Sequence, residues 1–372
     1  MNLSWWELEP FQTEWDFVIV GAGFAGSWCA YEILKRFPSC KLVILDRDCR
    51  PFGASIRNAG FACMGSPSEM ISDFERIGEA DTLKNAAMRL RGIRKIVDVL
   101  GPESVGYEPC FGYELLTQEL PFFDSVKANI SALNSNLVRA LGEEEVFSDA
   151  THEIASQGMK KFDLMVKNRL DGAIHSGRAL SKLHQLIQGM GARILLNAEA
   201  QAVEKDRASL KNGHSIRGRI VLLCTNAFGP LIVPELQIEP ARGQVMVTKP
   251  IAGLQLNGTF HMDEGFVYWR HLPGGRVLLG GGRNQAFDEE RTTAMETSDR
   301  IQNWLEEFLT RHFVQGEAFE IEHRWAGMMG FTPSKTIELT EIAGGVLSVA
   351  GCNGMGVALL PIVGELVAEK LC

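Results

Sequence analysis

The sequence predicts a mixed α/β protein in which a βαβ unit is combined with an inserted antiparallel sheet. A short apolar strand at residues 16–20 leads directly into a glycine-rich loop and a helix. Alternating strand and helix patterns return at residues 164–224. Beyond Pro240, apolar segments are separated by Pro/Gly turns such as Leu-Pro-Gly-Gly at 272–275, and such turns typically join antiparallel strands.

Each element is predicted from hydrophobic periodicity and from helix start and stop signals. The strand at 16–20 is followed by a helix at 25–36, which Pro38 ends, and by a second strand at 41–45. Helices are also expected at 68–100, 119–141, 177–188 and 292–313 and after residue 356, and strands at 113–116, 165–168, 192–196, 220–224, 244–248, 266–271, 276–279 and 346–350.

Length, composition and charge narrow the function classes. A chain of 372 residues is too long for one small core and predicts about two domains. With 45% hydrophobic and 22% charged residues, it has the composition of an ordinary globular protein rather than a disordered or collagen-like one. A net charge of −9 without a Lys/Arg block argues against nucleic-acid binding, so a small molecule or a basic partner remains open.

No transmembrane segment and no bound metal are expected. Residues 342–364 carry no charge, but six glycines and Pro361 favour a strand, a loop and a helix over one continuous span. The eight cysteines include no C-x-x-C pair and no Cys/His cluster at zinc spacing. The amino terminus lacks the basic region of a secretory signal, so reduced cysteines and a cytoplasmic location are expected.

The first glycine loop carries a dinucleotide-binding fingerprint. Gly21, Gly23 and Gly26 match G-x-G-x-x-G between a strand and a helix, and Asp46 lies 20 residues beyond Gly26. These glycines permit a tight turn, a close approach to a pyrophosphate and close packing of helix on strand. The Asp46 carboxylate can accept hydrogen bonds from the ribose hydroxyls. Because Asp46 would repel a 2′-phosphate, the expected ligand is NAD or FAD, which the fingerprint alone does not separate.

A second glycine cluster at 351–356 also lies between a strand and a helix. It provides another helix N-terminus at the far end of the chain, where partial positive charge favours an electron-rich group. A nicotinamide dehydrogenase has no evident use for it, whereas the longer FAD molecule is commonly held at both ends. The two loops together therefore favour FAD, with an ordinary glycine-rich turn as the alternative for the second.

With these motifs in place, the chain resembles the D-amino-acid oxidase superfamily, which includes glycine oxidase, sarcosine oxidase and γ-glutamylputrescine oxidases. The resemblance covers nearly the whole length. Besides both glycine loops, it rests on Gly-Ala-Ser-Ile-Arg-Asn-Ala-Gly at 53–60, Thr225-Asn226, Pro-Ala-Arg-Gly-Gln-Val at 240–245 and Trp-Ala-Gly at 325–327. It implies a Rossmann-like FAD-binding domain at 1–78, 150–230 and 330–372, and a substrate domain at 79–149 and 231–329.

The resemblance also implies non-covalent FAD and a set of cofactor contacts. Hydride transfer from the carbon of a C–N bond to flavin N5 would give an imine that water hydrolyses. The substrate would be a small amine or amino acid, and the acceptor O2 or an electron carrier. Cofactor contacts beyond Gly21, Gly23, Gly26 and Asp46 are expected from Phe24, Ala25, Arg47, Ser55, Arg57, Asn58, Ala59, Gly60, Val203, Thr225, Asn226, Gly351, Asn353, Gly354, Met355, Gly356 and Val357.

Three departures from the superfamily pattern concern the substrate side. The Arg that clamps a substrate carboxylate shortly after Trp-x-Gly is absent from the run Trp-Ala-Gly-Met-Met-Gly at 325–330, as is the Cys that anchors flavin in sarcosine oxidases. The Lys associated with oxygen activation is absent from 276–282. A flavin dehydrogenase that reduces a quinone or carrier protein, or a catalytically silent flavoprotein acting as a binding subunit, are the alternatives.

Tyr268, Arg270 and Met329 are the predicted catalytic or substrate-binding residues. In the strand at 266–271, alternation places Phe266, Tyr268 and Arg270 on one face, which by resemblance faces the flavin. Arg270 would replace the missing clamp, with an ion-paired Arg on the rim of the sheet as the equal alternative. The lone histidines are interpreted as structural.

Overall fold

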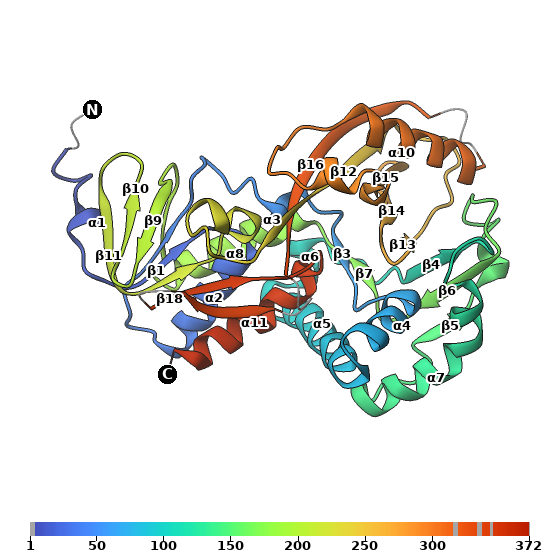
Figure 1. Ribbon diagram of the computed structural model, residues 1–372, viewed down its shortest axis with the longest axis horizontal. Coiled ribbons are helices and arrows are strands. Elements are labelled where there is room, and N and C mark those ends of the chain that lie inside the picture. Colours follow the sequence, from blue (N-terminus) through green and yellow to red (C-terminus); the bar gives the residue numbers. More distant parts are fainter. Residues whose placement is uncertain (1–3, 315–318, 333–336, 343–344, 372) are drawn as a thin grey trace.

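The computed structural model describes residues 4–314, 319–332, 337–342 and 345–371. Figure 1 shows two lobes side by side along the longest axis, each built around its own sheet. The long strands β12 (Glu239–Thr248) and β16 (Ile321–Phe331) extend from the second lobe towards the first. Within the described residues, no helix combines the length and apolar character needed to cross a membrane.

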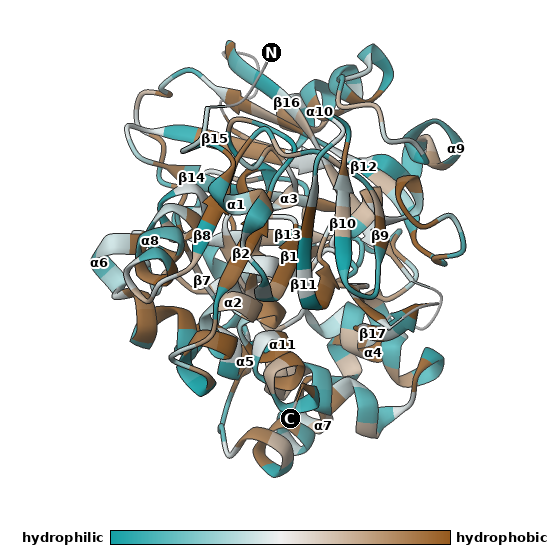
Figure 2. Cartoon of the chain, turned by 90° about the vertical axis from the view of Figure 1, so that its left-hand side faces the viewer, coloured by the Kyte–Doolittle hydropathy of each residue, from teal (hydrophilic) through white to brown (hydrophobic). Residues whose placement is uncertain are grey.

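The first sheet has the order β17-β18-β11-β1-β2-β8, and the hairpin of β9 and β10 joins it through β11. β1 (Trp15–Val20) pairs in parallel with both β2 (Leu42–Leu45) and β11 (Ser215–Leu223). A central parallel strand is covered on both faces, which explains the continuous apolar run that predicted β1. Figure 2 shows the hydrophobic character of β1 and β2. The other strands are β8 (Arg193–Leu195), β9 (Ala200–Glu204), β10 (Arg207–Leu210), β17 (Glu338–Ile342) and β18 (Val346–Ala350).

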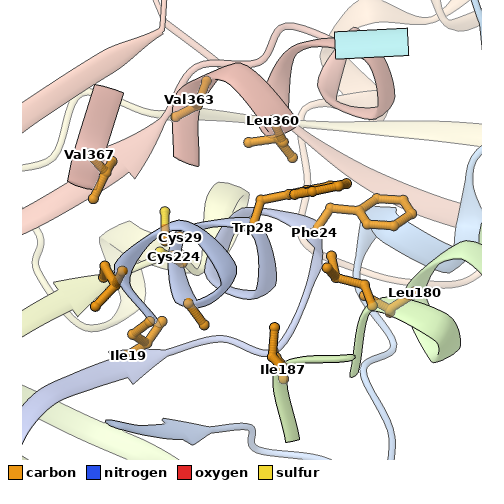
Figure 3. Packing of buried hydrophobic residues seen from close by; sticks show 14 of the residues in the cluster. Ile19, Phe24, Trp28, Cys29, Leu180, Ile187, Cys224, Leu360, Val363 and Val367 are labelled. Atoms are coloured by element: carbon orange, nitrogen blue, oxygen red, sulfur yellow. The ribbon is translucent and has the colours of Figure 1, made fainter. Parts of the chain in front are cut away.

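Helices from both ends of the chain pack together over this sheet. α2 (Phe24–Arg36) lies against α11 (Gly356–Lys370), and Figure 3 shows Trp28 beside Leu360 within the shared core. The helices approach so closely that a Cβ on Gly364 would stand 2.6 Å from the Trp28 carbonyl oxygen. The other helices of this lobe are α1 (Glu9–Gln12), α3 (Ala54–Arg57), α5 (Glu79–Leu100), α6 (Pro102–Val105), α8 (Ser176–Gly189) and η2 (Asn226–Leu231).

The second sheet has the order β16-β12-β15-β14-β13-β4-β6-β5. It is antiparallel except where β13 pairs with β4. Trp269 is fully buried in its core, stacked on Phe260 and Phe162 at ring-centroid distances of 5.6 and 6.0 Å. The remaining elements are β3 (Phe61–Ala62), α4 (Pro67–Arg76), β4 (Gly112–Leu116), α7 (Phe123–Leu141), β5 (Phe147–Asp149), η1 (Thr151–Glu153), β6 (Leu164–Asn168), β7 (Gly172–Ala173), β13 (Thr259–Met262), β14 (Val267–Leu272), β15 (Arg276–Gly281), η3 (Arg283–Gln285), α9 (Phe287–Glu290) and α10 (Asp299–His312).

The expected elements are present, with three differences. The helix expected at 68–100 is divided into α4 and α5 at Gly78, whose φ of 86° interrupts the helical backbone. The helix expected from residue 292 begins only at Asp299, because Ser298 is held by Gln244: Ser298 N donates to Gln244 Oε1 and its Oγ accepts from Gln244 Nε2. The expected cofactor-domain segment at 150–230 includes β6. In the structure, however, β6 pairs with β4 and β5 and therefore belongs to the second sheet. The proposed domain boundaries otherwise remain a prediction.

Gly92 is a point of close contact between α5 and α11, so its replacement tests this packing. A Cβ at Gly92 would overlap the Ala358 carbonyl oxygen, and we expect Gly92→Ala to lower the free energy of unfolding by about 2 kcal/mol. Gly189→Ala is the matched control, since its Cβ meets nothing within 4 Å and alanine favours a helix. Chemical denaturation of both variants gives the comparison; equal stabilities would contradict the contact.

Candidate functional site

One cavity of about 770 Å³ is lined by both lobes. Its walls include the carboxyl ends of β1, β2 and β18 on one side, and β12, β14 and β16 on the other. Ligand sites in open α/β sheets lie at the carboxyl ends of the strands, and the volume is in the upper range for cofactor and small-molecule sites. The cavity is therefore the candidate site.

The first glycine loop enters this cavity with backbone donors at its surface. Gly21 has a φ of 108°, a left-handed conformation that suits glycine, and a Cβ at Gly26 would overlap the Gly21 carbonyl oxygen. The N-cap residue of α2 is Gly23, which has no side chain to cap the helix, and Phe24 N in the first turn donates to Ser55 Oγ at 2.8 Å. The uncapped helix N-terminus is suited to phosphate oxygens.

Asp46 lies beside this loop at the end of β2. Its Oδ2 accepts from Ala22 N at 2.9 Å and its Oδ1 from Asp48 N at 3.2 Å. Burial raises the pKa of the Asp46 carboxyl, and these two hydrogen bonds oppose the rise. Nearby, the Arg47 guanidinium stacks 4.1 Å above the Phe228 ring. The carboxylate is thus oriented towards the cavity rim where a ribose would lie.

The second glycine loop enters the same cavity from α11. Asn353 and Gly354 have φ values of 46° and 87°, and Asn353 fixes the turn by donating to Gly351 O at 2.7 Å and accepting from Thr332 N at 3.1 Å. α11 begins after its N-cap residue Met355, whose side chain makes no capping hydrogen bond to the described residues. A second uncapped helix N-terminus therefore faces the site.

The segment at 53–60 connects the cofactor side to the second sheet. Arg57 Nη1 donates to Ala326 O at 2.8 Å, and Trp325 Nε1 donates to Arg57 O at 3.0 Å. Asn58 Oδ1 accepts from Gly60 N at 2.7 Å and from Ser176 Oγ at 2.6 Å. Two uncapped helix ends, an acid and this segment around one cavity fit an FAD molecule held along its length.

Most predicted site residues line this cavity, and five do not. Gly26, Gly60 and Gly351 lie behind it; their role is close packing or turn conformation. Val203 lies beyond the pocket end of β9 and packs against the core cluster of the first sheet. The residues that do line it are Gly21, Gly23, Phe24, Ala25, Asp46, Arg47, Ser55, Arg57, Asn58, Ala59, Thr225, Asn226, Tyr268, Met329, Asn353, Gly354, Met355, Gly356 and Val357.

Tyr268 and Met329, the predicted substrate residues, line the cavity together with Phe61 and His261, which makes this part of it the expected substrate end. The Tyr268 ring is edge-on to Phe61 at 5.9 Å and lies over Gly280, where a Cβ would stand 2.5 Å from the ring. Burial raises the pKa of Tyr268 to about 12, so its phenol is a neutral donor. Burial also lowers the pKa of His261 to about 4, so this imidazole is neutral near pH 7.

The predicted clamp Arg270 is wrong. Its side chain is on the strand that carries Tyr268, but it is 4% exposed and does not line the cavity. Nη1 donates to the carbonyl oxygens of Gly60 and Ile174 at 3.0 and 3.2 Å, and Nε donates to His271 O. These bonds hold the guanidinium against the segment at 53–60, which makes Arg270 a support for the cofactor wall.

Sequence reasoning missed Arg283, which does line the cavity. It begins η3 immediately after Gly281 and Gly282, whose φ values of 110° and 74° turn the chain out of β15. The guanidinium is 4.9, 5.2 and 4.5 Å from the ring centroids of Phe266, Phe287 and Phe331. The available sequence signal is an Arg directly after Gly-Gly-Gly at a strand end, one residue beyond the segment 276–282 that lacks a lysine.

Asp46→Asn tests the cofactor side. The variant keeps the shape of the side chain but loses the negative charge that strengthens its hydrogen bonds with the ribose hydroxyls. A hydrogen bond to a charged group contributes about 1.5–3 kcal/mol of free energy. We expect FAD to bind 10- to 100-fold more weakly, measured by titration of the deflavinated protein. Asp48→Asn is the control on the same loop; equal losses in both variants would contradict the ribose role.

Arg270→Met tests the correction. Because it removes the donor to the Ile174 carbonyl oxygen and one of the two donors to Gly60 O, which also accepts from Ile174 N, the free energy of unfolding is expected to fall by about 2 kcal/mol. The ratio of affinities for anionic and neutral ligands is expected to stay unchanged. A selective loss of anion binding at full stability would restore the clamp role.

Comparison with known proteins agrees with this architecture. The probable oxidoreductase OrdL of Haemophilus influenzae is 23% identical over 386 residues, covering 96% of this chain and 82% of that protein. The crystal structure of L-proline dehydrogenase from P. horikoshii has a TM-score of 0.76 at 18% identity, covering 96% of this chain and 93% of that one. Glycine oxidase from Geobacillus kaustophilus gives a TM-score of 0.76 at 18% identity, with coverages of 96% and 94%.

At such identities the two structures establish the fold alone. The model of the DAO family, described as FAD dependent oxidoreductase, matches residues 16–370. That match spans both glycine loops, the segment at 53–60 and all strands of the second sheet. The chain therefore belongs to the DAO family of FAD-dependent oxidoreductases.

Proposed function

We propose that this protein oxidises the C–N bond of a small amine or amino acid, using non-covalent FAD. The observation that carries the proposal is that the substrate walls, Tyr268 and Met329, belong to the same cavity as both cofactor loops. When bound, FAD accepts the two electrons removed from the substrate. The substrate loses a hydride from the carbon next to nitrogen and becomes an imine, which water hydrolyses.

The residues of the substrate end orient the substrate and exclude water. Tyr268 has a buried ring, and its hydroxyl has no hydrogen-bond partner within the described part of the chain, so it is free to bind substrate. Met329 and Phe61 add apolar walls. His261 is neutral near pH 7 and adds no charge that would repel an amine. A neutral amine can therefore be held without a dedicated base.

The thiols in the cavity support non-covalent cofactor binding. Cys63, Cys224 and Cys352 line it, but burial raises the pKa of Cys352 to about 12 and that of Cys63 well above its ordinary value. Such thiols are protonated at neutral pH and are poor nucleophiles. The position after Trp-Ala-Gly, where a covalent link would be sought by resemblance, holds Met328 and Met329.

A dehydrogenase that passes electrons to a carrier is the second candidate, and the composition of β15 favours it. This strand carries no lysine, and Lys211, which does line the cavity, is paired with Glu199 at its outer end. The cavity thus shows no ammonium group at the substrate end, within the described residues, to stabilise reduced oxygen species. Slow reoxidation of the reduced flavin in air would support the dehydrogenase; fast reoxidation would support an oxidase.

The test is the visible spectrum of the purified holoenzyme, recorded anaerobically while pools of amines and amino acids are added. Bleaching by one pool supports the proposal and identifies the substrate class. Tyr268→Phe should then slow bleaching about tenfold, since it removes one hydrogen bond to the substrate. Tyr107→Phe, outside the cavity lining, is the control. A flavin that no amine reduces would contradict the proposal and favour a silent binding subunit.

A further inference from the structure

We infer that Arg283 binds a carboxylate of the substrate, so that the amine oxidised by this protein carries an acid group. This inference rests on the proposed function and adds its substrate class. The guanidinium lines the cavity on η3, within the same end that Tyr268 and Met329 form. In register, Tyr268 pairs with Gly280, three residues before Arg283. A ligand at the phenol therefore lies close to the turn that carries the guanidinium.

The charge of Arg283 has no direct ion-pair partner in the part of the chain that the structure describes. Within the described residues, no carboxylate lies at ion-pair distance from it and no hydrogen-bond acceptor is assigned to it. The nearby Glu239 is paired with Arg291 instead. The other arginines that line the cavity have partners: Arg47 with Asp48, Arg57 with Ala326 O, Arg76 with Glu264 and Arg89 with Glu69.

Three phenylalanine rings lie close to this half-buried guanidinium. Phe266, Phe287 and Phe331 come from three different segments and surround it at 4.5 to 5.2 Å. Desolvation lowers the pKa of Arg283, yet an arginine stays charged at neutral pH. Cation–π contacts offset part of the desolvation, and a bidentate carboxylate is the ligand whose geometry a guanidinium matches.

The turn that carries Arg283 is fixed from outside the cavity. Asn284 Nδ2 donates to Asp263 Oδ2 at 2.7 Å, which ties η3 to the turn between β13 and β14. Arg300 Nη2 donates to Gln285 O at 2.6 Å from α10. Gly282 is packed so tightly on Trp304 that a Cβ would stand 2.9 Å from the ring. These contacts preorganise the guanidinium without using its own donors.

The position of Phe331 explains how the charge reaches the substrate end. Met329 and Phe331 are two residues apart on β16, so their side chains lie on the same face of the strand, and both line the cavity. By resemblance, the run that contains Met329 is where superfamily members carry a clamping arginine. Here Met329 leaves that place apolar, and Arg283 approaches the same strand from the turn after β15. The anion-binding charge is therefore supplied by a different element of the second sheet.

The direct test is ligand binding to the purified holoenzyme, without turnover. The protein is titrated separately with three acids (acetate, propionate and benzoate) and with the matching amides (acetamide, propionamide and benzamide). Changes in flavin absorbance and calorimetry give the dissociation constant of each ligand. In the unmodified protein the acids should bind more tightly than the amides. Arg283→Met should weaken acid binding about 30-fold and leave amide binding within about twofold, while Arg283→Lys restores part of the loss.

The matched control is Arg276→Met at the opposite end of β15, where Arg276 pairs with Glu322 and does not line the cavity, and it should change neither ligand series. Equal weakening of acids and amides by Arg283→Met, or loss of FAD from that variant, would overturn the inference. Turnover adds a second readout. In the unmodified protein, glycine should have a lower KM than methylamine, and proline a lower KM than pyrrolidine. In Arg283→Met, the KM values within each pair should become similar. If no amine reduces the flavin, the proposed function fails, while the binding titration still decides the role of Arg283.

Discussion

The close approach of α2 to α11 is the constraint on which the site depends. Gly364 brings the backbone of α11 against the Trp28 carbonyl, and Gly92 brings α5 against the other side of α11. Because each helix starts at a glycine loop, this packing sets two uncapped helix N-termini at one cavity. Partial positive charge then meets a dinucleotide at two places, although the loops are more than 300 residues apart in sequence.

The second sheet supplies chemistry that the first sheet lacks. Its strands present Tyr268 and Met329 to the cofactor side, and the turn after β15 adds Arg283. The half-buried Arg283 guanidinium has no ion-pair partner among the described residues and would gain one from an anionic ligand, whereas the buried Arg270 is bonded to two carbonyl oxygens. Two arginines of one sheet thus serve different purposes because their surroundings differ.

Much of the fold could be predicted because its signals are local. β1, β2 and α2 appear as a continuous apolar run, a glycine loop and a helix that a proline ends, and all lie where expected. The failures concern long-range partners. Gln244 holds Ser298 out of a helix that its own sequence favours, and pairing with β4 takes β6 into the second sheet. Val203 is expected from the resemblance and Arg270 from alternation along a strand, and neither argument specifies what lies opposite the side chain.

The sequence by itself determined the cofactor chemistry, since a tight turn, a close backbone approach and an acid at a strand end each require particular residue types at fixed spacing. Tertiary structure alone decided which charge is available to a substrate. Arg270 and Arg283 are equally basic in sequence, but carbonyl oxygens of the segment at 53–60 and residue 174 occupy one, while three phenylalanine rings leave the donors of the other unused. Solvation and hydrogen-bond partners come from residues distant in the chain, and only folding brings them together.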